Sequence, residues 1–345
     1  MSAAYKAIQW TPFKKAYDVA MALGVGGFLT TFILVSTLTF PAGERFSPIQ
    51  LLIRAFGACG FGLLTLILCI GPLARLSPRF LPLLYNRRHM GVTCFLLALV
   101  HAGLTLLWYH GFSDVNPLVS LLAANPRYSA LQGFPFESLG VVALIILFVM
   151  AATSHDFWNA NLGPVTWKSI HMSVYAAYAL LVGHILLGAV QQERSLVYPL
   201  VATASAVIVV TLHLLAGEKA RAADKAIAVQ ADGWLRVGAT ADIPEASARI
   251  VTPTRGEAIA VFKNKGKIFA LSNVCRHQGG PLGEGKVIDD CVTCPWHGFQ
   301  YRDDGHSPPP YKEEVAVYQT RIVEGVVFVR DAPSPGGATP TLIAA

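Results

Sequence analysis

The stretch from Cys275 to His297, CRHQGGPLGEGKVIDDCVTCPWH, decides the fold of the C-terminal part of the chain. It contains the pattern Cys-x-His, then sixteen further residues, then Cys-x-x-His. Thiolates and imidazoles are the side chains that bind zinc and iron in proteins. Because each half of the pattern offers one cysteine and one histidine in a loop rich in glycine or proline, we expect two loops on a rigid scaffold that close on one metal centre.

The sequence before this stretch is strongly apolar. Of the 345 residues, 53% are hydrophobic and only 14% are charged, which exceeds the apolar content of an ordinary globular domain. Charges are sparse from about residue 16 to residue 217 and return to the usual frequency from residue 218 onward. We therefore predict a membrane domain over 1–217, a linker over 218–233, a soluble domain over 234–331 and a flexible tail over 332–345.

Six apolar segments are long enough to cross a membrane, since a spanning helix needs about 20 apolar residues. Prolines and glycines mark most of the breaks between them. The segments are Ala16–Phe40, Leu51–Ile70, His89–Tyr109, Phe136–Ser154, Ser169–Val190 and Leu196–Gly217. In the soluble part, the pattern from Trp234 to Arg330 predicts short alternating strands separated by turns, with hairpins around 264–267 and 324–325. The predicted fold class is a membrane bundle of six transmembrane helices followed by a small all-β domain.

Lysine and arginine indicate the orientation of the bundle. They are frequent before the first span, between spans two and three, at the start of span five and after span six: Lys6, Lys14, Lys15, Arg75, Arg79, Arg87, Arg88, Lys168, Lys219, Arg221 and Lys225. The loops on the opposite side hold only Arg45, Arg127 and Arg194. By the positive-inside rule, both termini and the β domain lie in the cytoplasm. The net charge of +6 needs no nucleic-acid partner, because basic residues flank membrane segments.

The six cysteines divide into two groups of three. Cys59, Cys69 and Cys94 fall in apolar segments and are expected to be small buried residues. The soluble part holds an odd number, Cys275, Cys291 and Cys294, so a metal site explains them better than a disulfide framework. Zinc accepts two cysteines and two histidines, but its usual spacing places the two cysteines close together. A [2Fe–2S] centre with thiolates on one iron and imidazoles on the other takes one of each from each loop.

Residues 230–331 resemble the Rieske domain family in this respect. The resemblance implies a [2Fe–2S] cluster, whose ligand positions match Cys275, His277, Cys294 and His297. In members of the cytochrome bc type, a disulfide covers the cluster, but the matching positions here are Gly280 and Trp296. Those members also place a serine hydroxyl near a cluster sulfur, where this chain has Phe299, while the neighbouring tyrosine is kept as Tyr301.

The resemblance thus implies a ferredoxin-type cluster at the low end of the Rieske potential range, because hydrogen bonds to the sulfurs help to set the potential. Cys291 matches no ligand position and is expected to be a buried strand residue.

Ionisable residues at bilayer depth are candidates for function. At about 1.5 Å per residue, His101 lies roughly 18 Å into the third span and His184 roughly 24 Å into the fifth. We therefore expect these two side chains to bind one haem b between facing helices. Near the cytoplasmic end, His171 is the next candidate ligand, and His89 and His213 are weaker ones. For each, a hydrogen bond to a neighbouring helix is the alternative.

The histidines near span ends or in loops are expected to be structural. They are His110, His155 and His306.

The segments RRHMGVTCFLLALVHAG (87–103) and GPVTWKSIHMSVYAAYALLVGH (163–184) look like the ferric reductase-like transmembrane domain, over about residues 16–217. That family includes ferric reductases, NADPH oxidases and the haem subunit of the bacterial periplasmic methionine sulfoxide reductase system. It implies one or two haems b in a membrane, here a bacterial inner membrane. His171 and His184, thirteen apart, match its paired histidines, and His101 matches the ligand of the bacterial subunit. His89 and His101 are twelve apart rather than fourteen, which leaves the inner haem open.

Ferric reductases and oxidases of this family carry a cytoplasmic flavin and nicotinamide domain, but no G-x-G-x-x-G follows a strand here. We expect the Rieske domain to replace it, accepting electrons from a cytoplasmic ferredoxin or flavin-dependent reductase. The chain is then a ferric reductase-like oxidoreductase that delivers electrons to an acceptor across the lipid membrane. The alternative is a non-catalytic electron-transfer subunit or membrane anchor for a separate enzyme. A self-contained oxygenase is disfavoured, because beyond Gly217 only His306 remains for a two-His-one-carboxylate iron site.

Overall fold

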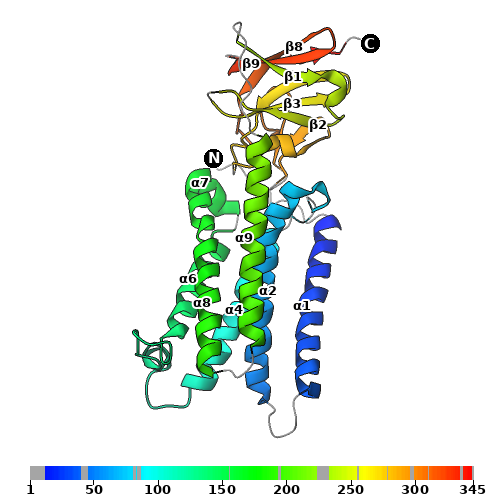
Figure 1. Cartoon of the computed structure of the whole chain (residues 1–345). Coiled ribbons are helices and arrows are strands. Elements are labelled where there is room, and N and C mark those ends of the chain that lie inside the picture. Colours follow the sequence, from blue (N-terminus) through cyan, green and yellow to red (C-terminus); the bar gives the residue numbers. More distant parts are fainter. Residues whose placement is uncertain are drawn as a thin grey trace.

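The chain forms a bundle of apolar helices followed by an all-β domain (Figure 1). The computed structural model describes residues 12–39, 46–80, 83, 87–154, 156–192, 196–223, 233–254, 256–277, 279–295, 299–309, 311–334 and 337–343. The β domain stands over the end of the bundle where α7 (Asp156–Met172) and the C-terminal end of α9 (Val197–Ala223) lie. Both parts of the predicted fold class are confirmed.

Five segments of the described residues are long and apolar enough to cross a membrane: Lys15–Thr39, Pro48–Leu76, Arg87–His110, Thr166–Gly188 and Val197–Lys219. The predicted fourth span is α6 (Phe136–Ala152), an apolar helix of 17 residues. At about 1.5 Å per residue it is a few ångströms shorter than the hydrocarbon core. The protein is therefore a multi-pass membrane protein with five candidate spans in its described part, not clearly six.

The remaining helices are α1 (Pro12–Thr39), α2 (Pro48–Leu76), α4 (Arg87–Thr105), α5 (Pro117–Ala123) and α8 (Val174–Gln192), with a π-helical turn η2 (Leu106–His110) and a 3-10 turn η1 (Pro78–Phe80). The predicted fifth span begins at Ser169, whereas the helices divide at Ser173. There the Ser173 N–H donates to the Ile170 carbonyl at 3.1 Å, a contact three residues back that ends α7.

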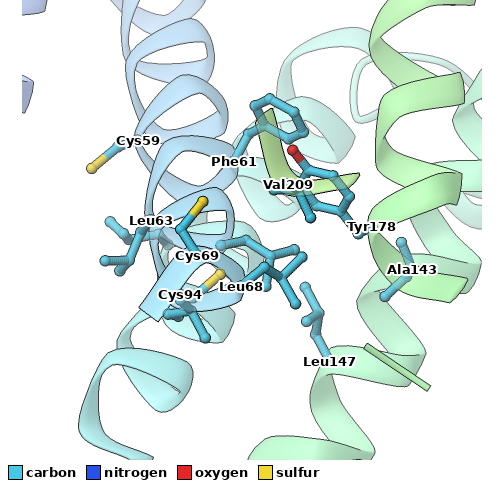
Figure 2. Close-up of a cluster of buried hydrophobic side chains, with 14 of the residues drawn as sticks. Cys59, Phe61, Leu63, Leu68, Cys69, Cys94, Ala143, Leu147, Tyr178 and Val209 are labelled. Atoms are coloured by element: carbon cyan, nitrogen blue, oxygen red, sulfur yellow. The ribbon is translucent and has the colours of Figure 1, made fainter. Parts of the chain in front are cut away.

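The bundle is organised around α2, which packs against α4 and α9, while α6 packs against α8. Ser47 starts α2 with a capping box: its Oγ accepts from the Gln50 N–H at 3.3 Å, and Gln50 Oε1 accepts from the Ser47 N–H at 3.1 Å. The core between the helices holds Phe61 stacked on Tyr178, with ring centres 5.4 Å apart (Figure 2). Cysteines line the same core, and those of the membrane part are buried as predicted: Cys59, Cys69 and Cys94.

The described residues of the β domain form two antiparallel sheets. The larger has the order β1-β9-β8-β4-β3-β2, with β10 pairing with β4, and the smaller has the order β5-β6-β7. The strands are β1 (Trp234–Ala239), β2 (Ser247–Val251), β3 (Ile259–Asn264), β4 (Lys267–Ser272), β5 (Lys286–Ile288), β6 (Cys291–Thr293), β7 (Gln300–Tyr301), β8 (Val317–Val323), β9 (Val326–Pro333) and β10 (Thr341–Leu342).

Both predicted hairpins are confirmed. Strands β3 and β4 meet at the pair Asn264 and Lys267, so Lys265 and Gly266 form a two-residue turn with φ of 47° and 72°. Two residues with positive φ give the turn whose twist matches that of the flanking strands. The second hairpin, at Glu324-Gly325 between β8 and β9, has the same form, with φ of 49° and 74°.

Truncating Phe262 tests the core that supports the metal loops. Its ring is 0% exposed and stacks on Phe269 at 5.4 Å. Phe262→Ala should lower the free energy of unfolding of this domain by about 3–5 kcal/mol, because it leaves a cavity. Thermal loss of the iron–sulfur absorption in the full chain measures the effect. Val323→Ala, at a site that is 48% exposed, is the matched control, and equal midpoints for the two variants would contradict the prediction.

Candidate metal centre and histidine pair in the membrane

The first metal loop follows β4 and is closed by its own backbone. The Cys275 N–H donates to the Gly280 carbonyl at 2.9 Å, and the Gly279 N–H donates to the Cys275 carbonyl at 2.7 Å. Gly279 has a φ of +71°, in the left-handed region that favours glycine. These contacts make a tight turn that presents Cys275 and His277 beyond the end of β4.

The second metal loop follows β6, and the Cys294 N–H donates to the Phe299 carbonyl at 2.8 Å. Cys275 and Cys294 are 1% and 0% exposed and belong to one buried cluster, so the fold brings the two predicted thiolates into one dry region. His297 and Trp296 lie outside the described residues. Among the described residues, no three His, Cys, Asp or Glu side chains gather as a metal site. The donor set on the two loops nevertheless fits a [2Fe–2S] group, because it places buried thiols beside an imidazole.

Two aromatic rings surround the first loop. Phe299 stacks on His277 with ring centres 4.6 Å apart and planes at 15°. The Tyr301 hydroxyl lies 3.5 Å from Cys275 Sγ and accepts from the Arg276 N–H at 3.1 Å. Burial, and then the neighbouring Cys275, raise the pKa of the Tyr301 hydroxyl, which keeps its proton for the sulfur. Sequence reasoning identified Tyr301 but missed the Phe299 stack, although an aromatic residue two positions after a ligand was a visible signal.

Cys291 lies in β6 opposite Ile288 and is half-buried, which raises the pKa of its thiol. Its place in a strand agrees with the prediction, but its burial is less complete than predicted. The strand is short and lies in the small sheet, so the side chain is only partly covered.

His101 and His184 face each other inside the bundle. Their ring centres are 6.4 Å apart and their planes are nearly perpendicular, at 85°. Imidazoles that share one metal ion at about 2.0 Å from each nitrogen have ring centres roughly 6 Å apart. The Nδ1 of His101 donates to the Ile53 carbonyl at 2.8 Å, and the Nδ1 of His184 donates to the Phe136 carbonyl at 2.9 Å. Each ring is therefore oriented through Nδ1, which leaves Nε2 as the nitrogen with which it could bind a metal.

Glycines make room for these rings. A Cβ on Gly57 would come 2.9 Å from His101 Nδ1, and one on Gly140 would come 3.0 Å from His184 Nδ1. Gly57 lies one helical turn after Ile53, and Gly140 lies one helical turn after Phe136. Each histidine lies 48 residues after the residue whose carbonyl accepts its hydrogen bond. The helix pairs α2–α4 and α6–α8 thus hold a histidine in the same way: a glycine on the first helix makes room for the ring, and a carbonyl on that helix accepts from Nδ1. The spacing from glycine to histidine is also equal in the two pairs, 57 to 101 and 140 to 184, and this signal is visible in the sequence.

The other candidate haem ligands have separate hydrogen-bond partners. His171 stacks on Trp167 at 3.7 Å, with its Nδ1 at the Trp167 carbonyl and its Nε2 3.5 Å from Ser154 Oγ. His213 bonds through both nitrogens, to the Val209 carbonyl at 2.8 Å and to the Tyr175 hydroxyl at 2.9 Å. The Nδ1 of His89 contacts the Asp18 carboxylate at 2.8 Å.

The histidines predicted to be structural are placed as follows. His110 is buried and bonds to Ser120 Oγ at 2.9 Å. His306 is exposed between Asp304 and Glu314, at 3.5 and 3.4 Å. His155 lies outside the described residues.

Two loops that each carry a cysteine and a histidine, on an all-β domain that follows a multi-pass helix bundle, define a membrane protein with a candidate metal centre. The family model of the Rieske [2Fe-2S] domain matches residues 233–319, and that of the ferric reductase like transmembrane component matches 56–182. The anthranilate 1,2-dioxygenase ferredoxin subunit of Burkholderia cepacia is 41% identical over 73 residues, which cover 21% of this chain and 68% of that protein. The chain belongs to the Rieske [2Fe-2S] family through this domain, and both predicted resemblances are confirmed.

Two further similarities complete the comparison. The protein-methionine-sulfoxide reductase heme-binding subunit MsrQ of Azospira oryzae is 34% identical over 140 residues, 41% of this chain. The chain spans only 55% of the length of that relative. Among solved structures, a complex of reduced oxygenase and oxidized ferredoxin in carbazole 1,9a-dioxygenase has a chain that matches 30% of this one and is itself 97% covered, at 26% identity and a TM-score of 0.29.

The Tyr301 hydroxyl should tune the cluster. Tyr301→Phe removes a donor near Cys275 Sγ, and such a hydrogen bond favours the more negative, reduced cluster. One hydrogen bond of about 1 kcal/mol corresponds to roughly 40 mV for a one-electron couple, so the midpoint potential should fall by about that amount. A redox titration followed by electron paramagnetic resonance measures it. Tyr318→Phe on β8 is the control, and an unchanged potential in Tyr301→Phe would refute the role.

Proposed function

We propose that this protein carries electrons across a bacterial inner membrane, from a cytoplasmic donor to an acceptor on the opposite side. The donor is a ferredoxin or a flavin-dependent reductase. The observation that carries the proposal is the presence, in one chain, of Rieske cluster loops and a facing histidine pair within an apolar bundle. The relative described as a heme-binding subunit supports haem b as the group in the membrane. When bound, the cluster and the haem supply one-electron redox chemistry.

The chain's own residues would hold these groups as follows. The thiolates of Cys275 and Cys294 and the imidazoles of His277 and His297 bind the [2Fe–2S] cluster. His101 and His184 bind haem b through Nε2, since the Ile53 and Phe136 carbonyls occupy Nδ1. The carbonyl contacts select one tautomer and fix each ring, so little reorganisation accompanies a change in the charge of the iron.

A second, inner haem has fewer candidates. His171 remains the first of them, because its Nε2 makes only a long contact, of 3.5 Å, with Ser154 Oγ. His213 is the least suited, because Tyr175 and Val209 engage its two nitrogens. His89 contacts the Asp18 carboxylate through Nδ1 and stays a weaker candidate.

The orientation follows from charge. Arg75, Arg79, Arg87 and Arg88 cluster where α2 ends and α4 begins, and Lys219 donates to the Arg75 and Leu76 carbonyls at this end. The positive-inside rule assigns such an end to the cytoplasm. With this orientation, the Rieske domain lies on the cytoplasmic side. We keep the division into a membrane domain over 1–217, a linker over 218–233, the Rieske domain over 234–331 and a tail over 332–345.

An alternative function is a non-catalytic electron-transfer subunit that serves a separate enzyme. The likeness to a protein described as a subunit favours it. Turnover of ferric chelate, quinone or oxygen by the purified single chain separates the alternatives, because a subunit without a substrate of its own gives none.

A reduced-minus-oxidised optical spectrum, with haem and iron quantified on the same sample, tests the cofactors. A spectrum without a b-type haem band would refute the proposal.

Removing one of the facing histidines should remove haem. His184→Ala should reduce the haem-to-protein ratio by at least about tenfold, since one axial ligand and its fixed geometry are lost. The ratio is measured from the optical spectrum of the purified chain. His110→Ala, a buried histidine bonded to Ser120, should keep the wild-type ratio.

A glycine variant sharpens this test. Gly140→Ala places a methyl group 3.0 Å from the His184 ring and should shift or partly abolish the haem band. Gly103→Ala on α4, where nothing lies within 4 Å of the new carbon, is the matched control. A changed haem band in both glycine variants, or in neither, would contradict the role of Gly140 in admitting the His184 ring.

Breaking the cluster should interrupt the path and spare the membrane domain. Cys294→Ala removes one buried thiolate, so a reduced ferredoxin should no longer reduce the haem. Haem content, and the final extent to which excess dithionite reduces the haem, should stay at the wild-type level. Stopped-flow absorption at the haem band follows both reductions. Unimpaired reduction of haem by ferredoxin in this variant would show that electrons bypass the cluster.

A further inference from the structure

Lys168 joins the membrane domain to the first metal loop. Its Nζ, on α7, lies 3.9 Å from the position that a Cβ on Gly279 would take. Gly279 belongs to the loop that carries Cys275 and His277, and it is tied to Cys275 by a backbone hydrogen bond of 2.7 Å. Figure 1 shows the β domain standing over the end of the bundle where α7 lies. An amine of the membrane domain is therefore placed beside the loop that binds the cluster.

The residue before Lys168 leads into the bundle. The Trp167 indole N–H donates to the Thr153 carbonyl at 3.0 Å, which anchors the ring at the C-terminal end of α6. A face of the same indole ring stacks on the His171 ring, with planes at 22° and ring centres 3.7 Å apart. One turn of α7 thus connects the loop contact with a histidine of the membrane domain.

We propose that Lys168 is a positioning residue that docks the cluster loop on α7, so that Cys275 and His277 are held beside the stack of Trp167 and His171. This surface is the junction at which an electron leaves the Rieske domain for the membrane domain. The inference rests on the proposed function and deepens it by naming the surface inside the chain that joins its two halves.

The positive charge of Lys168 makes the contact with the loop depend on the redox state of the cluster. Two ferric ions, two sulfides, two thiolates and two neutral imidazoles have no net charge, and the single electron taken from the donor leaves one negative charge. A cation near the loop attracts the reduced form more strongly than the oxidised form. Lys168 thus holds the loop most firmly when an electron is ready to leave and weakens its hold after the electron has left.

Photo-crosslinking tests the contact without relying on activity. A diazirine analogue of lysine is placed at position 168 of the full chain, and the crosslinked peptides are identified by mass spectrometry. A crosslink to the peptide that contains Gly279 is expected. The same analogue at Lys219, on α9 at the same end of the bundle, is the control and should give no such crosslink. Absence of the crosslink from position 168, or equal crosslinks from both positions, would overturn the proposal.

A charge series tests the role of the contact. Lys168→Gln should slow the cluster-dependent part of haem reduction by dithionite roughly tenfold at low salt, the effect of losing one charge-assisted contact. It should also lower the midpoint potential of the cluster. Lys168→Arg should restore most of both values, and Lys219→Gln should leave both unchanged. Added salt should slow the wild-type reaction and change that of Lys168→Gln much less, because salt screens the charge.

The outcomes separate this inference from the function on which it rests. Wild-type rates and potentials in Lys168→Gln, with the crosslink present, would overturn the positioning role and leave the proposed function intact. No cluster-dependent reduction of haem in the wild-type chain would overturn the proposed function, and the crosslink would still decide whether the loop docks on α7.

Discussion

An imidazole inside a membrane must be hydrogen-bonded, because an unsatisfied polar group in hydrocarbon costs several kcal/mol. The bundle meets this constraint in the same way on both sides of its histidine pair. His101 and His184 each donate Nδ1–H to a backbone carbonyl of the neighbouring helix. The close approach is possible only because Gly57 and Gly140 lack a side chain. The packing of α2 against α4 and of α6 against α8, and the direction of both Nε2 atoms, depend on this arrangement.

The β domain solves a related problem for sulfur. Two thiolates on mobile loops would be exposed to water, but here short backbone hydrogen bonds close each loop and bury Cys275 and Cys294. The aromatic residues that follow the second loop then serve the first one. Phe299 covers the His277 ring, and Tyr301 directs its hydroxyl to the Cys275 sulfur. Phe299 therefore supplies packing beside the first metal loop, while Tyr301 keeps a polar contact with the site.

The features of the fold that could be predicted from the sequence are those that local residue patterns specify. The hairpin at Lys265-Gly266 was predictable, since alternating residues and a turn pair are local signals. Membrane spans were predictable from apolar length, although α6 is shorter than expected and the fifth span divides at Ser173. His213 could not be assessed from depth alone. One of its two hydrogen bonds is to Tyr175, 38 residues away in sequence, and helical depth does not indicate which side chain lies opposite.

The sequence by itself determined the chemistry: a thiolate and imidazole pattern that suits an iron–sulfur cluster, apolar segments long enough for a membrane, and histidines at bilayer depth. These follow from residue type and spacing, which folding does not change. Only the tertiary structure decided which histidines face each other, where glycines admit their rings, and that Lys168 meets the loop at Gly279. Such contacts join residues far apart in sequence, and they depend on how helices rotate and pack, which no local pattern specifies.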